Sequence, residues 1–262
     1  MGHTLLTTAS IPSTQEFMRA HTAVLPEGAV LVADQQTQGK GRGGNVWTSP
    51  DGCLMFTAMR RLQVRVPGTQ AAFINYVVCL AVGGLNMQIK WPNDIYYAGV
   101  KVGGALIHTT WTSSKFSVLT GIGLNVSNSQ PTTCLDDIQQ QQCAAAAKVN
   151  KEQLLVSVLT HLESCFDQFE RHGFAPLQPL YLSSWMHSNQ QVVLEEESGG
   201  AGGSGSSSSG PAEQRQRVTL KIVGLSPYGF LLAVDAAGQQ YELTPDGNSL
   251  DMMQGLIRKK LS

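Results

Sequence analysis

The sequence is short of charge, since only 14% of its 262 residues are Asp, Glu, Lys or Arg and the formal net charge is −1. A general nucleic-acid binder needs a strong excess of Lys and Arg to neutralise phosphates, so we expect no nucleic-acid partner. No apolar run approaches the roughly 20 residues of a membrane helix, so we expect no membrane partner. Hydrophobic residues still make up 42% of the chain, which is enough to bury a core.

Cysteine is scarce and irregularly spaced. The five cysteines are an odd number without a C-x-x-C pair: Cys53, Cys79, Cys134, Cys143 and Cys165. This pattern is typical of a reduced protein with incidental thiols, and it predicts a cytoplasmic location. The sequence leaves a mitochondrial or plastid form open. The six histidines are scattered, so a His-rich metal site and a Ser-His-Asp set are also not expected.

Glycine, by contrast, is plentiful, and residues 39–44 fit the G-x-G-x-x-G dinucleotide fingerprint. In that fingerprint a strand leads into a helix that receives the pyrophosphate, and an acidic residue follows about twenty positions later. Here a predicted strand over 29–33 precedes the glycines, but turn residues and a second predicted strand over 53–59 follow them. Arg60 and Arg61 stand where the acid should lie. The pattern therefore argues against an NAD-type oxidoreductase.

The glycine-rich loop between these two strands offers Lys40, Arg42 and free backbone N–H groups. Such a loop suits an anion by charge and by backbone concavity. The alternative is a flexible exposed turn whose charges are incidental.

Asn93 and Asp94 follow a predicted strand over 88–91, at a strand end where ligand-binding groups commonly lie. Asp94 could hold Mg²⁺ or a ribose, and Asn93 could bridge phosphate, metal or base. The alternative is an Asn-Asp turn with a capping role.

Lys101 stands beside Gly103 and Gly104, and such a glycine pair lets a ligand approach the strand backbone closely. The lysine could neutralise a carboxylate or phosphate, or it could be a solvated lysine at a strand edge. Asn125 ends a glycine-containing strand as either a turn residue or a nucleotide contact. Trp47 and Trp91 can stack on a flat ring. Together these groups suit phosphoryl or adenylyl transfer, which depends on positioning and electrostatic stabilisation.

The periodicity predicts an α+β fold with a mixed sheet. A capping box at Ser13 opens a helix predicted to run through Val24. Further predicted elements are a buried helix over 70–85, paired strands over 100–111 and 115–122, and an amphipathic helix over 149–169.

A tract of almost pure Gly and Ser over 198–210 cannot pack a core. Strand-like sequence lies on both sides of it, so we expect a disordered hairpin insert over 196–214. Short strands and turn signals continue to the end of the chain. We therefore predict a catalytic domain over 1–184 and a small β-barrel domain over 185–262.

The chain resembles the biotin protein ligases, in particular the eukaryotic holocarboxylase synthetase type, in five segments. These segments span nearly the whole chain in order: 39–47 (GKGRGGNVW), 90–97 (KWPNDIYY), 101–104 (KVGG), 121–126 (GIGLNV) and 245–252 (PDGNSLDM).

The resemblance implies a class II synthetase-like catalytic domain, with helices flanking a mixed sheet, and a small SH3-like C-terminal barrel. The DNA-binding domain of some bacterial members is absent, so repressor activity is not expected. The resemblance further implies that ATP and biotin are the substrates and that Mg²⁺ assists the reaction. Biotin is activated as biotinyl-5′-AMP and transferred to a lysine on the biotin carboxyl carrier domains of acetyl-CoA and related carboxylases. A monomer or a homodimer both fit the resemblance.

The resemblance also implies site residues. Lys101 and Arg42 would be catalytic, and Asp94 would hold Mg²⁺. The biotin-binding set would be Ser13, Thr14, Gln15, Gln36, Lys40, Gly41, Arg42, Lys101, Gly103 and Gly104. The set for ATP and the adenylate would be Lys40, Arg42, Trp47, Asn93, Asp94 and Asn125. Gln15 departs from the family pattern, because many members carry Asn or another residue there.

Two alternatives share part of this chemistry. A lipoate–protein ligase would use the same activation but lacks the Lys90–Asp94 segment. A non-catalytic module that binds biotin or the carrier is disfavoured because mere binding would not need both Lys101 and Arg42.

Overall fold

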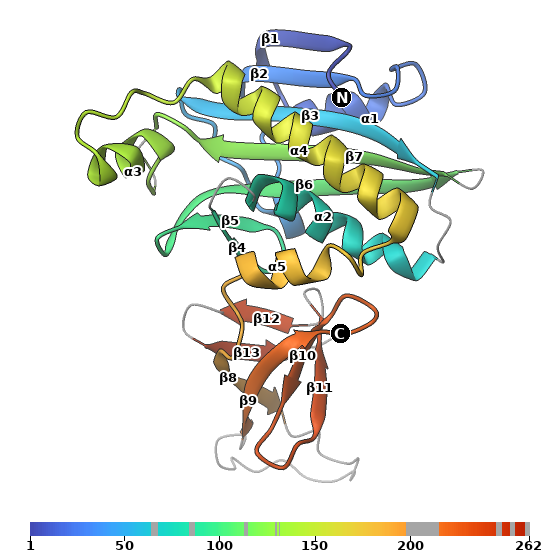
Figure 1. The fold of residues 1–262 in the computed structure, drawn as a ribbon, viewed down its shortest axis with the longest axis vertical. Coiled ribbons are helices and arrows are strands. Elements are labelled where there is room, and N and C mark those ends of the chain that lie inside the picture. The colour runs from blue at the N-terminus through green and yellow to red at the C-terminus, as the bar shows by residue number, and fades with distance from the viewer. Residues whose placement is uncertain are drawn as a thin grey trace, which may run out of the picture. The chain divides into compact units, whose positions relative to one another are not determined.

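The computed structural model describes residues 1–63, 68–83, 87–112, 115–128, 130, 132–197, 215–244, 248–251 and 255–259. The chain divides into two compact units, Met1–Met186 and His187–Ser262 (Figure 1). In the part of the chain that is described, no helix combines the length and apolar character needed to cross a membrane.

The described strands of the first unit form a seven-stranded sheet in the order β1-β2-β3-β7-β6-β5-β4. Its strands are β1 (Leu5–Ile11), β2 (Val30–Gln36), β3 (Cys53–Leu62), β4 (Gln88–Lys90), β5 (Asp94–Tyr97), β6 (Val100–Thr112) and β7 (Lys115–Asn125). β1 runs parallel to β2, and the other neighbours pair antiparallel. The predicted mixed sheet is therefore confirmed.

Helices cover both faces of this sheet. They are α1 (Thr14–Ala20), α2 (Ile74–Gly83), α3 (Leu135–Gln142), α4 (Lys151–His172) and α5 (Gln178–Ser184), with short 3₁₀ turns η1 (Arg42–Gly44) and η2 (Gly68–Phe73). α2 and α4 contact each other and lie against β6 and β3 respectively (Figure 1). α1 packs on the opposite face, where its Met18 joins a core with Met59 and Leu119.

The helix start predicted at Ser13 is confirmed, because the Ser13 hydroxyl accepts a hydrogen bond from the Glu16 N–H at 3.4 Å, while the Glu16 carboxylate pairs with Arg19 at 2.7 Å. α1 nevertheless ends at Ala20, so the predicted end at Val24 is wrong. The Thr22 hydroxyl bonds back to the Met18 carbonyl at 2.9 Å, and such a side-chain bond competes with the helical pattern.

α4 shows why an amphipathic pattern predicts a helix well. The Asn150 side chain caps it by accepting from the Gln153 N–H at 2.7 Å, and Gly173 ends it at φ 70°. Its buried stripe is Leu155, Val158, Leu159, Leu162, Phe166 and Phe169, while Leu154 and Cys165, which the sequence also predicted for this face, are only partly buried.

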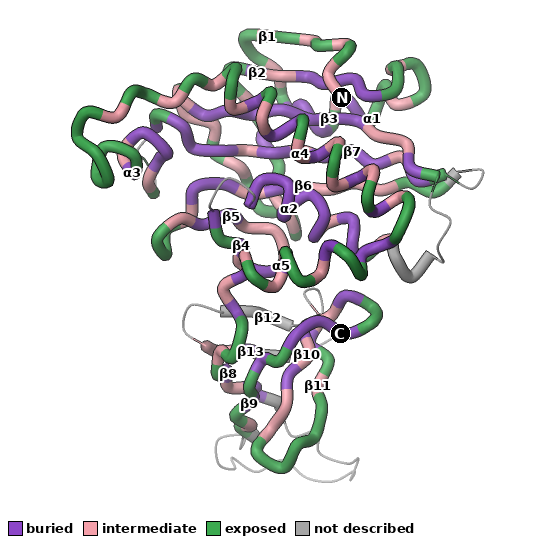
Figure 2. Tube along the Cα trace, viewed as in Figure 1, coloured by how far each residue is buried: buried purple, intermediate pink, exposed green. Residues whose placement is uncertain are grey.

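β1 has no counterpart in the sequence prediction. Its residues, LLTTASI, lack a clean alternation, and Leu5 is exposed because β1 lies at the sheet edge. Figure 2 shows this partly exposed edge, with β2 between it and the buried β3 and β7.

The described strands of the second unit form a six-stranded sheet in the order β11-β10-β9-β8-β13-β12. They are β8 (Gln191–Glu197), β9 (Arg215–Leu225), β10 (Leu231–Val234), β11 (Gln240–Leu243), β12 (Asn248–Asp251) and β13 (Leu256–Lys259). The end strands β11 and β12 do not pair with each other among the residues described. The unit is thus a mixed sheet, and its closure into an SH3-like barrel stays a prediction.

Parts of two predicted segments fall outside the described residues. Within the predicted insert, Glu197 ends β8 and pairs with Arg215 of β9, while 198–214 are not described. Within the C-terminal motif, 248–251 form β12, while 245–247 and 252 are not described.

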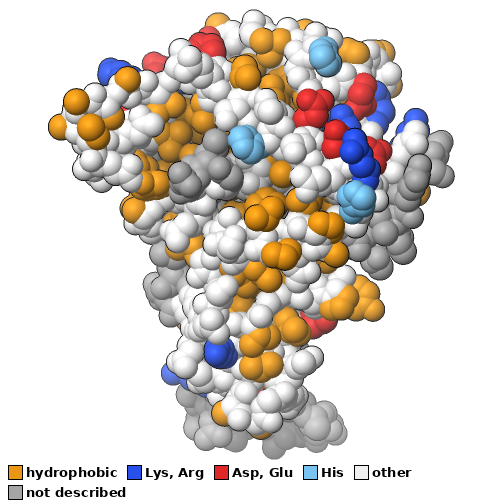
Figure 3. Space-filling view, viewed as in Figure 1, with side chains coloured by type: hydrophobic (Ala, Val, Ile, Leu, Met, Phe, Trp, Pro, Cys, Tyr) orange, Lys and Arg blue, Asp and Glu red, His pale blue; other side chains and the backbone are white. Residues whose placement is uncertain are grey.

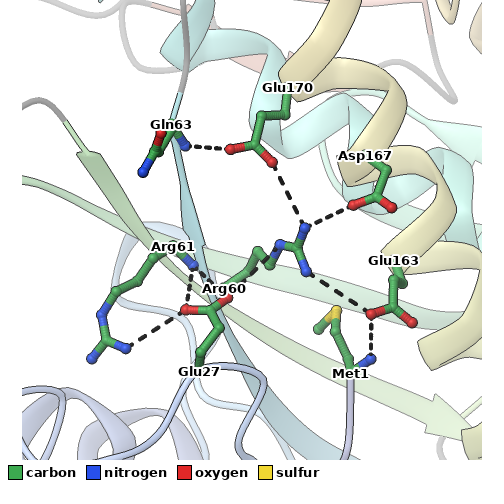
Figure 4. A network of polar contacts seen from close by, with 8 residues as sticks. All are labelled: Met1, Glu27, Arg60, Arg61, Gln63, Glu163, Asp167 and Glu170. Atoms are coloured by element: carbon green, nitrogen blue, oxygen red, sulfur yellow. Dashed lines mark hydrogen bonds and ion pairs between the residues drawn. The ribbon is translucent and has the colours of Figure 1, made fainter.

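Arg60 of β3 joins the sheet to α4 (Figure 4). Its guanidinium lies 2.7 Å from Asp167, 3.7 Å from Glu170 and 3.9 Å from Glu163, and its side chain is only 19% exposed. Glu27 approaches it at 3.8 Å and also accepts from the Arg61 N–H at 3.0 Å. Figure 3 shows charged side chains gathered over the end of α4. Arg60 therefore serves the packing of α4, whereas Arg61 binds the segment between α1 and β2 through Glu27 and the Thr22 and Leu25 carbonyls.

We predict that Arg60→Ala lowers the free energy of unfolding by about 1–3 kcal/mol, because it removes a largely buried guanidinium that bonds Asp167 and lies near three further carboxylates. Urea unfolding would measure this loss. The matched control is Arg171→Ala, since Arg171 is 72% exposed and lies 3.9 Å from the same Asp167. We expect a loss below about 0.5 kcal/mol for the control. Equal losses in the two variants would contradict the role given to Arg60.

Candidate active site

A buried polar cluster lies at the start of α1. The Thr14 N–H and hydroxyl donate to Oε1 of Gln36, at 2.8 and 3.1 Å. Gln36 ends β2, and its Nε2 faces the Met55 sulfur at 3.5 Å. Ser13, Thr14 and Gln36, predicted separately from the sequence, are thus brought together by the capped start of one helix and the end of a neighbouring strand.

Thr57 of β3 completes this cluster and was missed by the sequence analysis. Its fully buried hydroxyl lies 2.9 Å from Thr14 Oγ1 and 3.1 Å from Gln15 Oε1. Gln15 Nε2 in turn donates to the Leu119 carbonyl at 3.2 Å. The available signal was a lone threonine inside an otherwise apolar strand, which would be costly to bury without partners.

Glycines leave one face of the sheet, which we call the open face, without side chains of its own beside the cluster. Gly121 pairs with Thr57, and Gly123 pairs with both Met55 and Gly104, so all of them share one face. A Cβ on Gly121 would lie 2.7 Å from Gln15 Oε1, and a Cβ on Gly123 would lie 2.5 Å from Cζ2 of Trp47. The missing side chains therefore make the space that α1 and the Trp47 ring occupy.

The glycine-rich loop folds back on itself rather than entering a helix, as the sequence predicted. The Trp47 N–H donates to the Gly39 carbonyl at 3.0 Å, and the Gly41 N–H donates to the Asn45 carbonyl at 2.7 Å. Only the three-residue turn η1 lies between, with Gly43 at φ 66°. Lys40 is exposed on this loop.

The charge of Arg42 in this loop acts on Tyr76 of α2. Burial raises the pKa of the Tyr76 phenol to about 12, and the hydrogen bond from Trp91 and the nearby Arg42 charge oppose this rise. Trp91 is 2% exposed and donates from Nε1 to the Tyr76 hydroxyl at 2.8 Å. Trp91 is therefore a core residue, and the sequence was wrong to suggest it as a stacking surface.

Lys101 and Asp94 form an ion pair on the open face, with Nζ 2.7 Å from Oδ1 and both side chains partly exposed. A Cβ on Gly104 would lie 3.5 Å from Asp94 Oδ1 and 3.9 Å from Lys101 Cε. Asn93 is tied to the same strand, since its Nδ2 donates to the Ala105 carbonyl at 2.8 Å. The predicted cation, carboxylate and glycine thus lie together.

Two predicted site residues are engaged elsewhere. A Cβ on Gly103 would lie 2.5 Å from the Gly123 carbonyl and from Leu124 Cδ2, so packing between strands requires this glycine. The buried Asn125 amide donates to Thr132 Oγ1 at 3.0 Å, and Thr132 donates to the Lys101 carbonyl at 2.8 Å. Their roles toward biotin and nucleotide remain predictions.

The site has neither a metal cluster nor an activated thiol in the part of the chain that is described. That part contains no group of three or more His, Cys, Asp or Glu side chains placed to hold a metal ion. Burial raises the pKa of Cys53, the cysteine that contacts Asn125, to about 11, so this thiol is a poor nucleophile.

Comparison with known proteins identifies the family. The family model described as "Biotin/lipoate A/B protein ligase family" matches residues 7–125. Over 99% of its length the chain is 37% identical to "Biotin--protein ligase 1, chloroplastic" of Arabidopsis thaliana, of which it covers 70%. The chain belongs to the biotin protein ligase family.

Other members of the family differ in length or in sequence. The chain is 34% identical to the human "Biotin--protein ligase" over 99% of its own length, but it covers 36% of that protein. Among solved structures, the biotin protein ligase from Aquifex aeolicus in complex with biotin and ATP shares the fold. It has a TM-score of 0.67 and 24% identity, covering 92% of this chain and 95% of that one.

We predict that Gly123→Ala forces the Trp47 ring off β7, because the new Cβ would lie 2.5 Å from that ring. Acrylamide quenching of tryptophan fluorescence should increase, and the free energy of unfolding should fall by about 1–3 kcal/mol. The increase should disappear in a Trp47→Phe background. Gly224→Ala is the control, since a Cβ there meets nothing within 4 Å. Unchanged quenching in Gly123→Ala would refute this packing.

Proposed function

We propose that the protein is an ATP-dependent ligase that biotinylates carrier domains in two steps. The biotin carboxylate attacks the α-phosphate of ATP, which gives biotinyl-5′-adenylate and releases pyrophosphate. The ε-amine of a carrier lysine then attacks the acyl carbon, forming an amide and releasing AMP. One observation carries this proposal: in a chain of this family, the Thr14–Gln36 cluster and the Lys101–Asp94 ion pair lie on the same open face.

The polar cluster suits the ureido ring of biotin. That ring needs paired donors and acceptors in a mostly apolar pocket. We assign the ring to the cluster of Ser13, Thr14 and Gln36, with Gln15 behind it. The side chain of Met55 would supply close apolar surroundings.

The cationic end suits the two anions that must meet in the first step. Lys101 would lie against the biotin carboxylate and the α-phosphate and would stabilise the developing charge in both steps. We assign phosphate binding to Lys40 and Arg42, whose loop would also exclude water from the labile anhydride. The loop backbone at Gly41, and the strand backbone at Gly103 and Gly104, would let the ligand approach closely.

In this proposal Trp47 borders the adenine ring of ATP. Asn93, Asp94 and Asn125 lie near the rest of the nucleotide. Asp94 would serve Mg²⁺ as one carboxylate ligand, since no group of three or more His, Cys, Asp or Glu side chains is placed to hold a metal among the described residues. Mg²⁺ commonly takes one or two carboxylates and completes its shell with substrate phosphates and water. When bound with ATP, the ion would neutralise phosphate charge.

Several wider assignments also belong to the proposal. The partners would be the biotin carboxyl carrier domains of acetyl-CoA and related carboxylases, served by a monomer or a homodimer. The five free cysteines fit a reducing compartment such as the cytoplasm. We assign catalysis to residues 1–184 and an SH3-like closure to residues 185–262.

Lipoate transfer is the competing function, because the matching family model covers lipoate ligases as well. The polar cluster favours biotin, since the lipoyl ring has no ureido group to satisfy Thr14 and Gln36.

The test is incubation of the protein with ATP, Mg²⁺ and a carboxylase carrier domain, in the presence of biotin or lipoate. We expect mass spectrometry to show one biotinyl group on the carrier, and none when ATP is omitted. Transfer of lipoate in place of biotin would overturn the proposal.

Lys101→Ala provides the variant for the same assay. Because the anions would then meet without their main cation, we expect a loss of at least about 100-fold in adenylate formation, within the range typical of removing one preorganised charge. Melting temperature should stay close to that of wild type, since Lys101 is partly exposed. Near-normal adenylate formation would contradict the role of Lys101.

A further inference from the structure

We propose that Thr57 and Gln15 are positioning residues that make Thr14 a pure hydrogen-bond acceptor toward the ligand and so set the selectivity for an N–H donor such as the ureido ring. The proposal rests on the proposed function, and it concerns two side chains placed behind the ligand rather than against it. Thr57 is fully buried and Gln15 is 5% exposed.

The Gln15 amide has a fixed orientation. The Leu119 carbonyl can only accept, so the Gln15 group that lies 3.2 Å from it must be the NH₂ group. Oε1 of Gln15 therefore faces Thr57, at 3.1 Å. Oε1 also occupies the space that a side chain at Gly121 would need, because a Cβ there would lie 2.7 Å from it.

The Gln36 amide is fixed by the same reasoning. The Thr14 backbone N–H can only donate, so the Gln36 group 2.8 Å from it must be Oε1. This oxygen also lies 3.1 Å from the Thr14 hydroxyl and can accept its proton. Two acceptors, Gln15 Oε1 and Gln36 Oε1, thus stand at the two ends of the chain of hydroxyls formed by Thr14 and Thr57.

The hydroxyl protons can be arranged in only a few ways between these two acceptors. Thr14 donates to Gln36 while Thr57 donates to Thr14 or to Gln15, or else Thr14 donates to Thr57 and Thr57 donates to Gln15. In each arrangement the single proton of Thr14 points into the protein. A Thr14 proton that pointed outward would give up its bond to Gln36 Oε1, so the internal arrangements favour a Thr14 Oγ1 that accepts and hence a ligand with an N–H at that point.

Removing the Thr57 hydroxyl would weaken this arrangement without touching the ligand. We expect Thr57→Val, which keeps the side-chain shape, to raise the KM and Kd for biotin about 5- to 10-fold, the loss that corresponds to about one hydrogen bond. The KM for ATP and the kcat at saturating biotin should stay within about twofold of wild type. Thr57→Ser keeps the hydroxyl and should therefore bind biotin about as tightly as wild type.

Thr120→Val is the matched control. Thr120 is 1% exposed, lies on the neighbouring strand β7, and has a hydroxyl without a hydrogen-bond partner among the described residues. Its neighbour Leu119 packs with Met18 of α1, and successive residues of a strand point to opposite faces, so Thr120 points away from α1. This variant should keep the wild-type KM for biotin.

A double-variant comparison tests whether Thr57 acts through Thr14. In a Thr14→Val background, adding Thr57→Val should change the Kd for biotin, measured by calorimetry, by less than about twofold. Additive effects would overturn the positioning role, as would equal rises in the KM for ATP and biotin. If the valine variant does not fold, Thr57→Ala serves instead.

The outcomes separate this proposal from the function itself. A wild-type protein that transfers biotin, together with a normal Thr57→Val variant, would refute only the positioning pair. A wild-type protein that neither binds nor transfers biotin would overturn both.

Discussion

The first unit depends on a stretch of sheet that carries no side chains. Gly104, Gly121 and Gly123 lie on adjacent strands of one face, and the space above them is filled from outside the sheet. Gln15 reaches into it from α1, and Trp47 covers it from the glycine-rich loop. Larger residues at these positions would displace both, so the sheet determines where the helix start and the loop can lie. A binding site next to a rigid strand backbone follows from this constraint.

The open face of the sheet has two chemically different ends. At one end neutral donors and acceptors from Thr14 and Gln36 are held by buried partners, and at the other end Lys101 is held by Asp94. A small molecule with a polar ring and a carboxylate matches this arrangement. The ion pair also keeps the lysine in place before a ligand arrives, which lowers the cost of ordering a flexible side chain when the anions bind.

The sequence predicted the features that depend on local chemistry. The helix start at Ser13 and the failure of the glycine loop to enter a helix could both be seen in a few neighbouring residues. Thr57 could not be found in this way, because its importance comes from contacts with Thr14 and Gln15, more than forty positions away. The edge strand β1 was missed because one parallel neighbour is enough to form it without an alternating apolar pattern. Trp91 was misjudged because burial of its ring beneath α2 is a tertiary effect.

A crystal structure with biotinyl-5′-adenylate bound tests the central claim most directly. The account predicts that the ureido ring lies against Thr14 and Gln36, with an N–H donating to Thr14 Oγ1. It also predicts that the acyl phosphate lies beside Lys101 and that the adenine lies against Trp47. An adenylate bound on another face of the sheet, or a ureido ring that makes no hydrogen bond to Thr14 or Gln36, would contradict the account.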